Sequence, residues 1–208
     1  SSSENAGAAV GVAAGLGVLW FTLRSVKKFI LDVLGAMGVE ATVEATNNAE
    51  TETLEVQIIG DDMGSQRALM ISPEQVREFV TPGAKKLIEI AHSYGVKVIY
   101  HSCGSIYEAI PDIIETGADA IHPIQAKAAN MEAWRLQKEF GDKVSFCGGV
   151  DTQELLPNGT PEDVKANVRE LREIFPTGLI ISPSHEALQV DVPEENVKAM
   201  FDAIAEMK

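Results

Sequence analysis

Cysteine is scarce in this sequence, with two residues in a chain of 208. Two cysteines cannot build the disulfide framework that staples small secreted proteins, so that class is excluded. Histidine is almost as rare, with four residues. Because His101 stands two positions before Cys103, we expect a reduced, cytoplasmic compartment and either a metal ion or a reactive thiol.

Basic residues are also few, at 17 Lys and Arg against 31 Asp and Glu, which gives a formal net charge of -14. A nucleic-acid partner is therefore not expected, because binding requires a basic face that neutralises phosphates. We interpret the excess of acidic residues as a contribution to solubility. The sequence also lacks a G-x-S-x-G elbow, a G-x-G-x-x-G fingerprint and a P-loop.

Long apolar runs are limited to one N-terminal stretch, residues 6–23, which carries no charge and is followed by Arg24, Lys27 and Lys28. Its 18 residues reach the length of a membrane helix. Most of them are Ala and Gly, which gain little from lipid, so we favour a buried segment of a soluble domain over a membrane span. We assign residues 1–57 to this apolar and helical segment with its acidic connection, and residues 58–208 to a second part.

Short apolar runs alternate with helical patterns through that second part of the chain. Five runs predict strands that end near Gly60, Tyr100, His122, Phe146 and Ile181. Helix-start signals of the type Ser/Thr-Pro-Glu lie between some of them. This alternation predicts an α/β fold with parallel pairing through right-handed crossovers. A closed (βα)8 barrel has eight strands in about 250 residues, so we expect an incomplete barrel of about five units, with an open sheet as the alternative.

Reactive side chains gather at the ends of these runs, where three of the four histidines and both cysteines lie. They are His101, Cys103, His122, Cys147 and His185, and the first run ends in Asp61 and Asp62. Parallel strands that present polar groups at their C-terminal ends are how a βα-barrel builds an active site. We therefore expect the active site at this edge.

The pair His101 and Cys103 is the sharpest of these signals. At a spacing of two on an extended segment both side chains fall on the same side, which makes half of a tetrahedral zinc site. His185 and Cys147 are competing candidates for the third ligand. Zinc with one open position acts as a Lewis acid and lowers the pKa of a bound water or thiol.

The remaining candidates each have a structural alternative. Asp61 and Asp62 point in opposite directions on an extended segment, so one of them faces the site as a general base, a substrate-orienting acceptor or a metal ligand, or else caps the turn that follows. His122 either binds substrate or is a hydrogen-bonded structural histidine. Asp151 either faces the ligand or caps a helix.

Several motifs from about Ile58 onward resemble the uroporphyrinogen decarboxylase superfamily, and most closely its methyltransferase branch that works with corrinoid proteins. The matching stretches are Gly60-Asp61-Asp62-Met63-Gly64-Ser65-Gln66, Ser72-Pro73-Glu74, His101-Ser102-Cys103-Gly104-Ser105, Phe146-Cys147-Gly148-Gly149-Val150-Asp151-Thr152-Gln153, Gly159-Thr160-Pro161-Glu162 and Asp191-Val192-Pro193-Glu194-Glu195. They follow the family order over roughly 150 residues.

This resemblance implies a (βα)8 TIM barrel in which His101 and Cys103 ligate zinc, and a methyl group that moves between a small methylated substrate or thiol acceptor and a cobalamin on a separate protein. The branch takes its third ligand from a Cys after the last strand. This chain has Ser184-His185 there, so His185 would substitute. The resemblance also implies that the barrel's first strands precede the matching part.

A zinc-dependent methyltransferase is therefore our first hypothesis, with Asp61 or Asp62, Gln66, His122 and Asp151 around the substrate. One alternative is a tetrapyrrole decarboxylase that uses acidic and histidine groups without metal. Another is a non-catalytic partial barrel that acts as an assembly subunit. Unpaired sheet edges in an incomplete barrel predict a fragment, a natural remnant or a second chain that completes the barrel.

Overall fold

A computed structural model describes Lys28, Asp32, residues 62–185 and residues 188–207. The chain forms two compact units, residues 1–58 with 89–96 and residues 59–88 with 97–208. In the first unit the Lys28 ammonium lies 2.6 Å from the Asp32 carboxylate, which also accepts the Tyr94 hydroxyl at 2.8 Å. The predicted apolar segment 6–23 and the strand ending at Gly60 lie outside the described residues.

None of the helices in the described ranges is long and apolar enough to cross a membrane. The longest helical run of the described residues is capped by Ser72, whose hydroxyl accepts the backbone N–H of Gln75 while the Gln75 side chain accepts the N–H of Ser72. This reciprocal cap starts the helix where the Ser-Pro-Glu signal predicts. The run comprises α2 (Pro73–Gln75), a π-helical turn η1 (Val76–Val80) and α3 (Thr81–Ser93).

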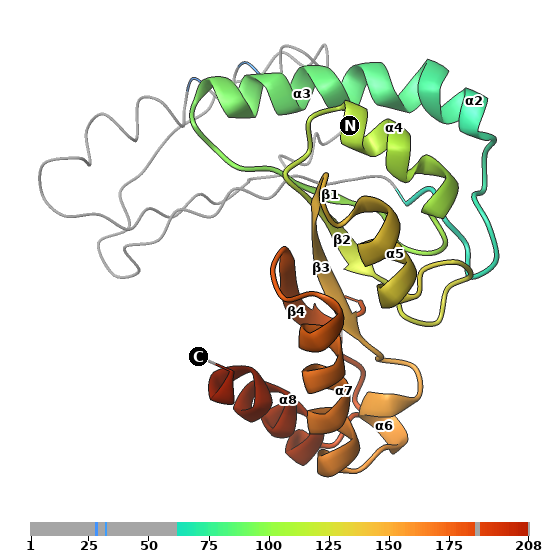
Figure 1. Ribbon diagram of the computed structural model, residues 1–208. Coiled ribbons are helices and arrows are strands. Elements are labelled where there is room, and N and C mark those ends of the chain that lie inside the picture. Colours follow the sequence, from blue (N-terminus) through green and yellow to red (C-terminus); the bar gives the residue numbers. More distant parts are fainter. Residues whose placement is uncertain (1–27, 29–31, 33–61, 186–187, 208) are drawn as a thin grey trace, which may run out of the picture. The chain divides into compact units, whose positions relative to one another are not determined.

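Four parallel strands form the sheet in the second unit, in the order β1-β2-β3-β4 (Figure 1). They are β1 (Ile99–His101), β2 (Ala120–Ile124), β3 (Ser145–Val150) and β4 (Leu179–Pro183). Each strand pairs with the next one along the chain, as right-handed crossovers in a βα-barrel produce. The predicted α/β class with parallel pairing is confirmed, and the four strands of the described residues do not close into a barrel.

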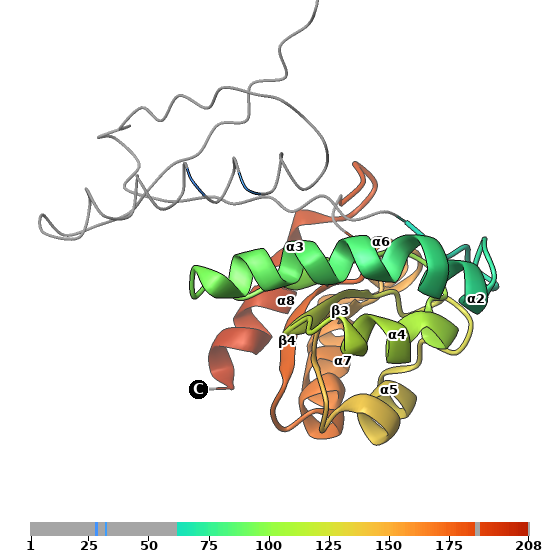
Figure 2. The same ribbon diagram turned by 90° about the horizontal axis from the view of Figure 1, so that it is seen from above.

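Helices α4, α5 and α7 lie on one side of the sheet, and α8 packs along α7 (Figures 1 and 2). The segments between and after the strands are η2 (Tyr107–Ala109), α4 (Ile110–Glu115), α5 (Ala133–Phe140), α6 (Leu155–Asn158), α7 (Pro161–Ile174) and α8 (Glu194–Glu206). Thr160 caps α7 in a second reciprocal box with Asp163. Both α2 and α7 thus begin where the Ser-Pro-Glu and Thr-Pro-Glu signals predict.

The core fills the space between the sheet and these helices. Phe146 on β3 and Phe175 after α7 are buried and meet edge to face, with ring centroids 5.7 Å apart. Ile121, Leu171 and Met200 are also buried. Burial of each large apolar side chain stabilises the fold by about 1.5–3 kcal/mol. The strands are therefore held rigidly from one side, and this fixes their C-terminal ends.

Two strands run further than the sequence predicts. β2 continues through Pro123 to Ile124, and β3 continues through two glycines to Val150. A side chain at Gly148, which has φ +120°, would lie 2.7 Å from the backbone nitrogen of Ile124. Glycine therefore allows β3 to approach β2 at this point. As a result His122 and Cys147 lie inside strands and not at their ends.

Candidate metal centre

His101 and Cys103 meet at the end of β1, with the Cys103 Sγ 3.7 Å from the His101 Nε2. The Asp62 carboxylate joins them, and its Oδ1 lies 3.2 Å from the same imidazole nitrogen. The nearest ligand atoms of the three side chains all lie within 4.8 Å of one another. Among the described residues no other set of three such side chains comes together in this way.

The segment that carries Asp62 is tied to the end of β1 by hydrogen bonds that backbone N–H groups donate. Asp62 Oδ1 accepts the N–H of Cys103 at 2.8 Å, and the buried hydroxyl of Ser102 accepts the N–H of Met63 at 2.9 Å. One step further, the N–H of Ser105 donates to the carbonyl of Ser65 at 2.7 Å. These bonds hold the carboxylate beside the thiol, although about 40 residues separate them in sequence.

Two glycines make this close approach possible. A side chain on Gly64 would lie 2.6 Å from the Cys103 carbonyl oxygen. One on Gly104, which has φ +84°, would meet the Gly64 backbone and lie 2.7 Å from the Ser65 carbonyl oxygen. Neither position has room for Cβ, so both glycines are needed to place Asp62 against Cys103.

His122 lies next to His101 across the sheet. The two residues are register partners on β1 and β2, and their Nδ1 atoms are 2.8 Å apart. The rings are tilted by 37°, and both side chains are half-buried. His122 therefore contacts the predicted ligand set through His101.

A chain of hydrogen-bonded glutamine side chains extends from the loop that follows β1. The backbone N–H of Gly104 donates to Gln125 Oε1 at 2.6 Å, and Gln125 Nε2 donates to Gln66 Oε1 at 2.5 Å. Gln66 Nε2 then donates to Gln153 Oε1 at 2.9 Å. Gln66 was expected near the substrate, whereas the sequence analysis missed Gln125. Its signal was present, since it directly follows β2, where a parallel sheet gathers its polar groups.

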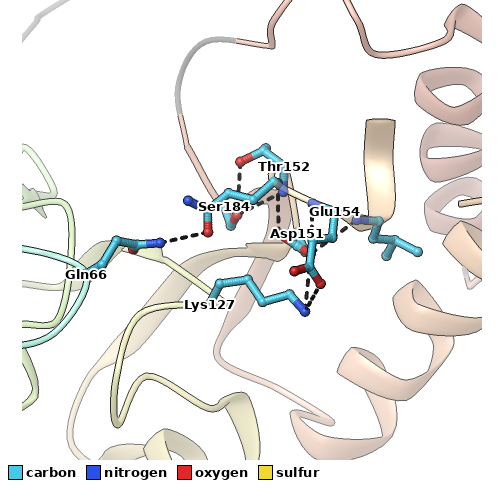
Figure 3. Close-up of polar contacts among 8 residues, drawn as sticks. Gln66, Lys127, Asp151, Thr152, Glu154 and Ser184 are labelled. Atoms are coloured by element: carbon cyan, nitrogen blue, oxygen red, sulfur yellow. Dashed lines mark hydrogen bonds and ion pairs between the residues drawn. The ribbon is translucent and has the colours of Figure 1, made fainter. Parts of the chain in front are cut away.

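Asp151 caps the turn that leads into α6 (Figure 3). Its Oδ1 accepts the N–H of Gln153 at 2.8 Å, and its Oδ2 accepts those of Glu154 at 3.2 Å and Leu155 at 3.1 Å. The buried carboxylate also lies 3.8 Å from the Lys127 ammonium, which contacts Glu154 at 2.6 Å. The hydrogen bond to Glu154, with the charge of Asp151, raises the pKa of Lys127.

The two competing third ligands lie outside the group of three. Cys147 is buried on β3 with its Sγ 3.4 Å from the Ser182 hydroxyl, and burial raises the pKa of its thiol. His185 is exposed just after β4, beside the buried Ser184, whose hydroxyl accepts the N–H of Thr152 at 3.2 Å. Asp61 lies outside the described residues.

The set of donors fits a zinc ion. Thiolate sulfur, imidazole nitrogen and carboxylate oxygen are the ligands that zinc takes in proteins, and three protein ligands are typical of a catalytic site. The thiol and the carboxylate would also supply the negative charge that offsets the ion. His101, Cys103 and Asp62 are thus the described residues that can hold a metal.

Comparison with known proteins gives consistent matches. The family model described as "Uroporphyrinogen decarboxylase (URO-D)" matches residues 36–207. A methylated-thiol–coenzyme M methyltransferase of Methanosarcina mazei is 30% identical over 142 residues, which are 68% of this chain and 36% of that protein. A solved methyltransferase from Methanosarcina mazei superposes with a TM-score of 0.54 at 23% identity, over 65% of this chain and 38% of that one. The match thus spans little more than a third of either relative.

Proposed function

The chain belongs to the uroporphyrinogen decarboxylase family, and from this we propose that it acts in a zinc-dependent methyl transfer between a small substrate and a corrinoid protein. The observation that carries the proposal is the approach of Asp62, His101 and Cys103 to within 4.8 Å at the C-terminal edge of a parallel sheet. Active sites of βα-barrels are built at this edge.

In this proposal His101 binds the ion through Nε2 and Cys103 through Sγ. Asp62 would be the third ligand through its carboxylate, whose Oδ1 lies 3.2 Å from the same imidazole nitrogen. His185 and Cys147, the competing third ligands expected from the sequence, lie outside the group of three, so the proposal gives the third position to Asp62. When bound, zinc would supply Lewis acidity that lowers the pKa of an acceptor thiol, which is a poor nucleophile in its neutral form.

The chain's own residues hold this set in place and surround the substrate. We propose that Gln66 contacts the substrate directly, because its amide is exposed and lies in the loop that carries Asp62. Asp151 would act indirectly, because its oxygens accept three backbone N–H groups that shape residues 153–155. Asp61, which lies outside the described residues, stays a proposed acid or base.

The proposed partners follow from the motifs and from the relative's name. The motifs resemble a branch that works with a cobalamin-bearing protein, and the curated relative acts on methylated thiols and coenzyme M. We therefore propose a corrinoid protein as one partner and a thiol or methylated thiol as the small substrate. Transfer from the methylated corrinoid to a thiol would break the cobalt–carbon bond, leave its electron pair on the cobalt of the partner protein, form a carbon–sulfur bond and release the thiol proton.

A transfer assay tests the proposal. Zinc-loaded protein is mixed with free methylcobalamin and coenzyme M, and the loss of the methyl–cobalt absorbance is followed. Wild type and Cys147→Ser should turn over, and Cys103→Ser should lose at least about 10²-fold in rate. Equal rates for wild type and Cys103→Ser would contradict the proposed role of the thiolate.

The two alternatives give different outcomes in parallel measurements. A decarboxylase would turn over a porphyrinogen without added metal, and Cys103→Ser would leave this rate unchanged. A non-catalytic partial barrel would elute as a stable hetero-complex on size exclusion and bind no zinc. Either result would replace the methyltransferase proposal.

A further inference from the structure

His122 contacts the candidate ligand His101 through a short bond between ring nitrogens, the two Nδ1 atoms 2.8 Å apart. We propose that His122 is a positioning residue that fixes the tautomer and ring orientation of His101 by accepting its Nδ1–H. His101 then presents the lone pair of Nε2 toward Asp62 and Cys103. This inference rests on the proposed metal site and adds the group that orients one of its ligands.

The proton positions follow from the chemistry of imidazole. A neutral ring carries one N–H and one lone pair, and a metal takes the lone pair. If His101 Nε2 binds the ion, the proton of that ring must lie on Nδ1. The Nδ1 of His122, 2.8 Å away, is placed to accept this proton. His122 must then carry its own proton on Nε2.

The sheet holds both rings in place. His101 and His122 are register partners on directly paired strands, and the N–H of Ser102 donates to the His122 carbonyl at 2.9 Å. Both side chains therefore project from rigid backbone, and not from loops. Sites built on strands keep their geometry better than sites on loops.

An imidazole acceptor differs from the usual partner of a ligating histidine. That partner is most often a carboxylate, a backbone carbonyl or a water. Here it is a neutral ring, which orients His101 without adding negative charge beside the ion. Within the candidate set of described residues, Cys103 and Asp62 then supply the charge that balances the metal. With less negative charge beside it, a bound zinc ion would polarise its remaining ligand more strongly.

Metal affinity tests the inference, with two variants at one position. His122→Leu removes the acceptor, whereas His122→Asn places an amide oxygen near the former Nδ1. Zinc affinity, measured by competition with a chromogenic chelator, should fall about 10–100-fold for Leu. The Asn variant should stay within about threefold of wild type, since it keeps the acceptor. His92→Leu, at an exposed position on α3, is the control and should leave the zinc affinity unchanged.

A second readout needs no variant. In wild-type protein with ¹⁵N-labelled histidine and bound zinc, NMR should show the proton on Nδ1 of His101 and on Nε2 of His122. The reverse assignment for either ring would overturn the inference, whatever the variants do.

The outcomes separate the inference from the function it rests on. Unchanged zinc affinity in His122→Leu would overturn the positioning role and leave the metal site intact. Failure of wild type to bind zinc would overturn both. A loss of affinity in His122→Leu that His122→Asn restores, with the expected proton positions, supports both.

Discussion

Asp62 and Cys103 are joined by a hydrogen bond of 2.8 Å from the Cys103 backbone N–H to Asp62 Oδ1, across 41 positions of sequence. The same oxygen lies 3.2 Å from His101 Nε2. The Asp62 carboxylate thus binds the end of β1 and also lies beside the imidazole of His101. These two contacts give Asp62 two roles that substitutions can separate.

Asp62→Asn is expected to keep the bond to Cys103, because the amide oxygen can accept the same N–H, but to lose the charge. Zinc affinity should fall about 10–100-fold while the thermal midpoint changes little. Asp62→Ala should lose affinity and also stability, by about 1 kcal/mol, through the lost hydrogen bond. Chelator competition and thermal unfolding measure the two effects. An Asn variant with full affinity would show that Asp62 is not a ligand.

Gln125 is expected to stabilise the loop that carries Cys103. Its Oε1 accepts the N–H of the buried Gly104, so Gln125→Leu leaves a buried donor without a partner and should cost about 1–3 kcal/mol. Gln153→Leu, at the exposed end of the amide chain, should cost less than about 0.5 kcal/mol. Urea unfolding of both variants measures the difference, and equal costs would contradict it.

Gly104 has no tolerance for a side chain. Gly104→Ala would force an L-residue to φ +84° and press Cβ against the Gly64 backbone. We expect a loss of about 2 kcal/mol or more together with weaker zinc binding. Gly83→Ala is the matched control. A Cβ there meets nothing within 4 Å on the exposed side of α3, so it should stabilise the protein by about 0.5–1 kcal/mol. Tolerance of both substitutions would show that the Gly64–Gly104 contact does not constrain the site.

Asp163 makes the start of α7 sensitive to acid. Hydrogen bonds from the hydroxyl and the backbone N–H of Thr160 lower the pKa of this carboxyl below its usual value. A pKa that is lower in the folded state adds stability above the unfolded pKa of about 4, and this stability is lost as the pH falls through the folded pKa. Asp163→Asn should therefore lower the thermal midpoint at pH 7, and the difference from wild type should shrink below about pH 4. Parallel pH profiles for the two proteins would contradict this assignment.

Two of the three residues of the candidate centre could be predicted, because they follow an apolar run that predicts a strand. The spacing of His101 and Cys103 predicts that their side chains point the same way, and the structure brings Sγ to 3.7 Å from Nε2. The bond between Asp62 and the Cys103 backbone could not be predicted, because it depends on how two distant loops pack. Gln125 was missed because glutamine is not by itself typical of any site.

The strand boundaries show why local propensity misled. Pro123 normally ends a central strand because it cannot donate to the ladder, yet β2 continues to Ile124. Gly148 and Gly149 have low strand propensity, yet β3 runs through them. A side chain at Gly148 would meet the backbone of β2, and one at Gly149 would meet Leu171 on α7. The helix starts were predicted correctly, since Ser72 and Thr160 act through bonds to residues only three positions away.

The zinc content of reconstituted protein tests the account most directly. Wild type, Cys103→Ser and Cys147→Ser are loaded with zinc, freed of excess metal and analysed by mass spectrometry for metal per chain. The account predicts about one ion in wild type and in Cys147→Ser, and almost none in Cys103→Ser. Equal, sub-stoichiometric zinc in wild type and Cys103→Ser would contradict it.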